Sequence, residues 1–116
     1  MPEIVISLET SEALSKEVEM DDEGIRDWRM KIDVVDEILV DLLNRRASFA
    51  LEIGRIKKLK GLPVHMPERE EEILEHVQRV NKGPLTDDMV KRLFERILDE
   101  SRRLEREYSY GGGELW

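Results

Sequence analysis

The sequence contains no cysteine, only 5% aromatic residues and no long apolar run, and each absence excludes a class of protein. Without cysteine there can be no disulfide framework, thiol nucleophile or cysteine-ligated metal site. No segment approaches the roughly 18 consecutive apolar residues that a membrane-spanning helix needs. The N-terminus also lacks the basic and apolar segments of a secretory signal. We therefore expect a cytoplasmic protein that does not contact a membrane.

The charge of the chain and its histidine content argue against two classes of ligand, nucleic acid and metal ions. Charged residues make up 40% of the chain, and the formal net charge is −8. Such an acidic chain repels nucleic acid at long range, so no nucleic-acid partner is expected. The two histidines, His65 and His76, lie eleven residues apart and lack the accompanying ligands of a metal centre. We therefore expect no bound metal.

The longest predicted element is a helix from about Asp22 to Lys60, followed by a stop at Gly61. Its apolar residues recur three and four positions apart, as on one packed helix face. They are Ile25, Trp28, Ile32, Val35, Leu39, Leu42, Phe49, Ala50 and Ile53. At roughly 55 Å this helix exceeds what a compact domain needs, so we expect it to pack along a partner. Gly54 lies inside it at a cost of about 1 kcal/mol relative to alanine, which close approach of another backbone would explain.

Two further helices complete a predicted all-α fold of one domain, residues 23–107. The second begins at Pro67, since proline suits a first helical turn. A turn at 81–84 separates it from a third helix, for which Thr86 is the predicted N-cap. Residues 1–22 are expected to be an acidic flexible leader, and residues 108–116, with their glycine triplet, a flexible tail.

Polar residues interrupt the apolar faces of the first and third helices. Arg46 and Lys57 stand where the rhythm predicts apolar residues, on one face to within roughly 20° and ~16 Å apart along the axis. Either an anion or acidic side chain meets them, or they extend into water along the surface. Ser101 and Glu105 likewise lie on the apolar face of the third helix. They indicate a polar pocket inside the bundle or, alternatively, a solvated last turn.

In this pattern the chain resembles the AroQ-type chorismate mutases from about Ile25 to Glu107. Three segments carry the resemblance: Trp28-Arg29-x-x-Ile32-Asp33-x-x-Asp36 through Leu42-Leu43-Asn44-Arg45-Arg46, Ala50-x-x-Ile53-Gly54-x-x-Lys57, and Pro63-Val64-His65-Met66-Pro67-Glu68-Arg69-Glu70. The third helix is similar from Leu93-Phe94 to Glu100-Ser101. The resemblance implies three helices in an interlaced homodimer, with two active sites built from both chains.

The resemblance also implies roles for individual residues in binding the dianion chorismate. The residues implied are Arg29, Arg46, Lys57, Arg69, Glu70, Ser101 and Glu105. Arg46, Lys57 and Arg69 correspond to cations that bind substrate, Glu70 to the acceptor of the ring hydroxyl, and Ser101 to a carboxylate-binding hydroxyl. Lys57 and Glu105 would flank the ether oxygen, so that Lys57, Glu105 and Arg46 are the implied catalytic residues. Arg29 would come from the other subunit, because it lies seventeen residues and roughly 25 Å from Arg46 on one helix.

The implied reaction is the intramolecular rearrangement of chorismate to prephenate, which needs neither metal nor organic cofactor. Two residues depart from the family pattern. Met66 stands where many relatives carry aspartate, and Glu105 stands where glutamine is commonest. A carboxyl can donate a hydrogen bond only when protonated, so Glu105 must be protonated to act. The alternatives are an isochorismate–pyruvate lyase of the same fold and a non-catalytic helical dimer whose basic residues are solvated.

Overall fold

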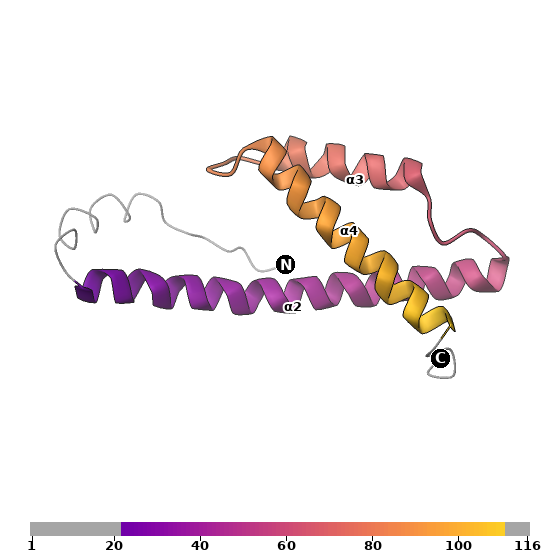
Figure 1. The fold of residues 1–116 in the computed structure, drawn as a ribbon, viewed down its shortest axis with the longest axis horizontal. Helices are drawn as coiled ribbons and strands as arrows, with labels where there is room; N and C mark the ends of the chain where they lie inside the picture. The colour runs from indigo at the N-terminus through magenta and orange to yellow at the C-terminus, as the bar shows by residue number, and fades with distance from the viewer. Residues whose placement is uncertain (1–21, 111–116) are drawn as a thin grey trace. The chain divides into compact units, whose positions relative to one another are not determined.

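The computed structural model describes residues 22–110, and all the regular structure within them is helical. The elements are α2 (Asp22–Lys60), α3 (Pro67–Val80) and α4 (Asp87–Tyr110), as Figure 1 shows. The predicted all-α class and the three predicted helices are therefore confirmed. The predicted leader, apart from Asp22, and the tail from residue 111 lie outside the described residues. α4 continues through residues 108–110, where the predicted tail begins.

α2 ends at the predicted glycine through a left-handed C-cap. Gly61 adopts φ 68°, a conformation that a side chain would strain. Its N–H donates to the carbonyl of Lys58, and the N–H of Leu62 donates to the carbonyl of Lys57 at 2.8 Å. These two bonds form a Schellman motif, which satisfies carbonyls that the helix end would otherwise leave unpaired. The linker to α3 therefore leaves α2 in a defined direction.

The turn between α3 and α4 is built by local side-chain hydrogen bonds. The Asn81 side chain accepts from the N–H of Gly83 and donates to the carbonyl of Leu85 and the carboxylate of Asp87. Thr86 acts as the predicted N-cap, since its hydroxyl accepts from the N–H of Met89 at 3.1 Å. α3 begins at the predicted proline, although its N-cap residue makes no side-chain capping bond.

By its internal contacts the chain divides into two units, residues 1–42 and 43–116. The described part of the first unit is the beginning of α2. The second unit contains the end of α2, the linker, and the pair of packed helices α3 and α4. Among the described residues only two large apolar side chains are buried, Val77 of α3 and Leu98 of α4.

Most of the predicted apolar stripe of α2 is not covered by the described residues. Ile25, Ile32, Leu39, Phe49 and Ile53 are all about half exposed or more. An apolar surface of this extent on a chain with so small a core is typical of an interaction site. Between residues 22 and 110, no helix combines the length and apolar character needed to cross a membrane.

Candidate active site

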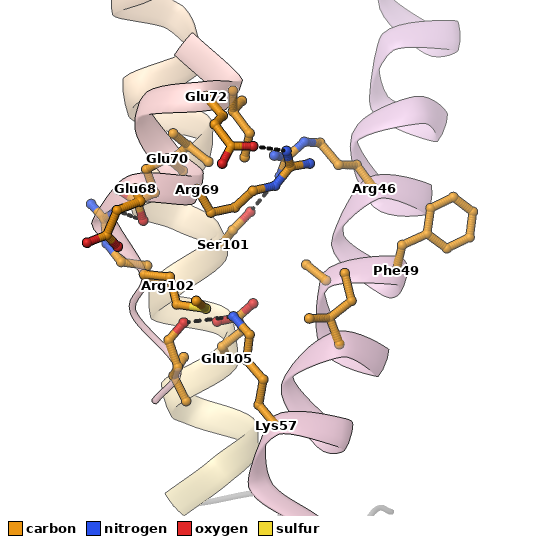
Figure 2. Close-up of a pocket in the computed structure, with 16 residues that line it drawn as sticks. Arg46, Phe49, Lys57, Glu68, Arg69, Glu70, Glu72, Ser101, Arg102 and Glu105 are labelled. Carbon is orange, nitrogen blue, oxygen red and sulfur yellow. Dashed lines mark hydrogen bonds and ion pairs between the residues drawn. The ribbon is translucent and has the colours of Figure 1, made fainter. Parts of the chain in front are cut away.

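The second unit contains an open cavity of about 610 Å³, within the range of about 300–1,000 Å³ common for small-molecule sites. Its walls come from the end of α2, the linker, α3 and α4 (Figure 2). Six of the seven residues implied by the sequence line it: Arg46, Lys57, Arg69, Glu70, Ser101 and Glu105. The seventh, Arg29, is exposed, belongs to the first unit and is not among the lining residues.

Arg46 and Ser101 face each other across the cavity from α2 and α4 (Figure 2). The Nη1 of Arg46 donates to the Ser101 hydroxyl at 3.2 Å, and both side chains are partly buried. The guanidinium retains further N–H donors in a planar fork that suits a carboxylate. Arg46 therefore points toward α4 and not outward along the surface, which excludes the solvated alternative for this residue.

Lys57 reaches the cavity from the last turns of α2. Its Nζ donates to the backbone carbonyl of Val64 in the linker at 3.1 Å. An ammonium has three N–H groups, so two remain available to a ligand. The linker also places Met66, the N-cap of α3, in the cavity wall. A thioether therefore occupies this part of the wall.

The charges of Lys57 and Arg46 on α2 and of Glu70 on α3 act on Glu105. Burial raises the pKa of Glu105 above its usual value, and Glu70 raises it further. Lys57, Arg46 and Arg102 act in the opposite direction but do not cancel the effect of burial. The cavity therefore makes Glu105 easier to protonate than an exposed glutamate, and a protonated carboxyl can donate a hydrogen bond.

Gly54 lies next to the Glu105 side chain. A Cβ at position 54 would lie 3.8 Å from the Cγ of Glu105 and 3.9 Å from its Cδ, which is ordinary van der Waals contact. Within the described residues, the nearest group is therefore a carboxyl-bearing side chain and not the backbone that the sequence suggested. In this chain the glycine lies beside Glu105, which lines the cavity.

The charges of the cavity wall are balanced in number, and half of the charged groups are in ion pairs. Four cations (Arg46, Lys57, Arg69 and Arg102) face four carboxyl groups (Glu68, Glu70, Glu72 and Glu105). Arg69 contacts Glu72 at 3.5 Å and Arg102 contacts Glu70, whereas Arg46 and Lys57 bond to the uncharged groups described above. Protonation of Glu105 would leave a net positive wall. No three His, Asp or Glu side chains between residues 22 and 110 are placed to hold a metal ion.

Arg102 is a lining residue that sequence reasoning missed. It donates to Glu70 of α3 and to Asp99 of its own helix. The spacing of Asp99 and Arg102 was the only sequence signal, and it also fits an ordinary surface ion pair. His65 was considered only as a metal ligand, yet its Nε2 lies 3.6 Å from Oε2 of Glu70.

Comparison with known proteins agrees with this geometry. Residues 28–106 match the family described as chorismate mutase type II. The bifunctional chorismate mutase/prephenate dehydratase of Aquifex aeolicus is 38% identical over 88 residues, which are 72% of this chain and 24% of that protein. The chorismate mutase of Methanocaldococcus jannaschii is 28% identical over 87 residues, 74% of this chain and 88% of that one. The chain thus spans about a quarter of the length of the Aquifex relative.

A solved structure extends the similarity to the fold. Chorismate mutase (form II) from Thermus thermophilus superposes with a TM-score of 0.69 at 36% sequence identity. The superposition covers 71% of this chain and 93% of that chain. Since the family match over residues 28–106 includes every residue that lines the cavity, and the solved structure shares the fold, the chain belongs to the chorismate mutase type II family.

Proposed function

We propose that this protein is a chorismate mutase, which converts chorismate to prephenate by an intramolecular rearrangement. The observation that carries the proposal is the cavity in which Arg46 and Lys57 of α2 face Ser101 and Glu105 of α4. Two cations bonded only to uncharged protein groups can exchange those bonds for a carboxylate at little electrostatic cost. Family membership supports the same substrate.

Substrate binding would use the arginine fork and the hydroxyl opposite it. Arg46 and Ser101 already approach to 3.2 Å, and a substrate carboxylate could accept from both. Arg69 adds positive potential from α3, and Glu70 would accept the ring hydroxyl of the substrate. Holding a flexible dianion in its compact reactive form is a proximity effect, which accelerates the reaction without a nucleophile.

Stabilisation of the transition state would come from Lys57 and Glu105. Negative charge develops on the ether oxygen as its bond to the ring breaks, and fixed donors in a cavity stabilise it best. Lys57 retains two N–H groups after bonding to Val64, and a protonated Glu105 supplies a second donor. Burial raises the pKa of Glu105, which favours that protonation state relative to an exposed glutamate.

The working enzyme in this proposal is a homodimer in which Arg29 enters the partner's site. The exposed apolar stripe of α2 supports an association along that helix, because it offers a second copy a large apolar surface. The charge balance supports a further cation, because a nearly neutral wall would be left negative by a substrate carrying two negative charges. Arg29 is a cation on α2 that does not line the cavity of its own chain.

The test of the activity is loss of chorismate absorbance with purified protein, combined with identification of prephenate as the product. Turnover of chorismate to prephenate is the expected result. If isochorismate is consumed with release of pyruvate while chorismate persists, the protein is a lyase instead. If neither is consumed and Arg46→Ala leaves stability and association unchanged, the chain is a non-catalytic helical dimer.

The test of the shared site is complementation between two inactive variants. Arg29→Ala and Lys57→Ala are purified separately, mixed and allowed to exchange subunits. Each mixed dimer then contains one intact site, so about a quarter of wild-type activity should return. A mixture that exchanges subunits yet remains inactive would show that Arg29 and Lys57 act in the same chain.

A further inference from the structure

Arg102 ties two helices together at the edge of the cavity. Its guanidinium donates through Nη1 to Glu70 on α3 and through Nη2 to Asp99 on α4 (Figure 2 shows the first contact). The side chains of Arg102 and Glu70 are 25% and 23% exposed, whereas that of Asp99 is 53% exposed. The pair with Glu70 therefore lies in the cavity wall, and the pair with Asp99 lies nearer the solvent.

The contact occupies one oxygen of Glu70 in particular. Arg102 bonds to Oε2, and the ring nitrogen of His65 approaches the same atom at 3.6 Å. A carboxylate has acceptor capacity on both oxygens, so Oε1 can still accept a hydrogen bond from a ligand. A bond to a fixed cation also prevents rotation of the carboxylate, which keeps the second oxygen in one place.

We propose that Arg102 is a positioning residue, which anchors Glu70 through Oε2 so that Oε1 can accept the hydroxyl of the substrate. This inference rests on the proposed function, because it concerns the recognition of that hydroxyl. Arg102 does not itself bind the substrate: both ends of its fork are held by carboxylates, which neutralise its charge. Asp99, the more exposed of the two carboxylates, is the outer anchor: it binds Nη2 of Arg102 and so holds the guanidinium in the orientation in which Nη1 reaches Glu70 on α3.

Electrostatics of the cavity support this coupling. The hydrogen bond from Arg102 to Glu70 is the main reason that the pKa of Arg102 is raised. Glu105 experiences both members of the pair, since Glu70 raises its pKa and Arg102 lowers it, alongside Lys57 and Arg46 of α2. Removing Arg102 should therefore shift the titration of Glu105 upward, even without substrate.

The decisive experiment compares Arg102→Gln with Arg103→Gln. Arg103 is a matched control, because it is the next residue on α4, pairs with a carboxylate three positions earlier and is 61% exposed. The hydroxyl contact exists before and during the reaction, so its loss should raise KM more than it lowers kcat. We expect KM for chorismate to rise about tenfold in Arg102→Gln, as for a lost hydrogen bond to a charged group, and to stay unchanged in Arg103→Gln.

A double-mutant cycle separates positioning from direct binding. Glu70→Ala removes the acceptor, so adding Arg102→Gln to it should cause no further rise in KM. If Arg102 bound the substrate itself, its loss would raise KM equally in both backgrounds. If Arg102 were only structural, the melting temperature would fall while KM stayed at the wild-type value. Either of these results would overturn the proposal.

Two measurements keep the inference testable if Arg102→Gln does not fold or if chorismate is not the substrate. Asp99→Asn leaves Arg102 in place but removes its outer anchor, and it should raise KM about two- to threefold, as for a weak exposed ion pair. Carbon-13 NMR of the substrate-free protein follows Glu105 directly. Its titration should shift upward in Arg102→Met but not in Arg103→Met, because methionine removes the positive charge at position 102 that lowers the pKa of Glu105. An unchanged titration would overturn the coupling whatever the substrate, whereas a shift without chorismate turnover would reject the proposed activity alone.

Discussion

The two parts of α2 carry the same apolar rhythm but differ in what interrupts it. In residues 22–42, apolar residues occupy the stripe, and Ile25, Ile32 and Leu39 are 52%, 56% and 49% exposed in the single chain. In residues 43–60, the stripe alternates with Arg46 and Lys57, which line a cavity together with Ala50. Helical periodicity thus identifies a face, and the interruptions identify where that face becomes a site.

The comparison also separates two sources of free energy. Covering the exposed apolar residues of the first part would stabilise an assembly by the hydrophobic effect. The polar part contributes little to stability, because buried charges are costly unless paired. Substitutions in the two parts should therefore have different consequences, with loss of association in one and loss of activity in the other.

The largest effect is expected from Leu39→Asp. If a second copy covers this residue, two leucines per dimer lose about 1.5–3 kcal/mol each, so association should weaken by about 3–6 kcal/mol. Val34→Asp is the control, because Val34 is similarly exposed (55%) on the opposite face of α2. Sedimentation over a range of concentrations measures the strength of association of both variants. Equal behaviour of the two variants would contradict a dimer formed along the stripe.

Lys57→Ala tests the polar part of α2. Loss of a donor to the ether oxygen should cost at least about 2.7 kcal/mol of transition-state stabilisation, or about 100-fold in kcat. Lys58→Ala, the exposed neighbour, should retain activity. Both variants should sediment like the wild type, which distinguishes this loss of activity from the loss of association expected for Leu39→Asp. Near-wild-type turnover by Lys57→Ala would remove the ammonium from the mechanism.

The third prediction concerns pH. The pKa of Glu105 is raised by burial, so the protonated donor is lost as pH rises through that pKa. Above it, kcat/KM should fall about tenfold per pH unit, the equivalent of about 1.4 kcal/mol. The stability that protonation of Glu105 contributes should be fully present below its unfolded-state pKa and lost as pH rises to its folded-state pKa, because burial raises the folded-state pKa above the unfolded-state one. Glu105→Gln should flatten the pH profile, and an unchanged profile would reject the role.

The helix boundaries were predictable because their causes are local. Gly61 ends α2 through its own φ angle and two neighbouring hydrogen bonds. Thr86 caps α4 by accepting a hydrogen bond from the N–H of Met89, three residues further along the chain. Each signal lies within a few positions of the boundary that it sets. No knowledge of packing was needed.

The site was only partly predictable, because periodicity does not give the packing of one helix on another. Arg46 and Ser101 were found as interruptions of apolar faces, a property of each helix alone. The contact between Glu70 and Arg102 spans 32 positions and depends on how α3 packs on α4. Nothing in the spacing of these two residues indicates it. Arg29 depends on a second chain, so its role stays a prediction.

The smallest effect comes from comparing Gly54, which lies inside α2, with Gly61, which directly follows its last residue. Gly54→Ala should raise the free energy of unfolding by about 1 kcal/mol, because alanine is the better helix former and its Cβ meets Glu105 only at 3.8 Å. Gly61→Ala has open space around it but retains a φ of 68°, so it should lower stability by about 1 kcal/mol or more. Urea denaturation measures the free energy of unfolding of both variants. A strongly destabilised Gly54→Ala would mean that the backbone of a second copy approaches Gly54, which would extend the interface from the exposed stripe to the edge of the cavity.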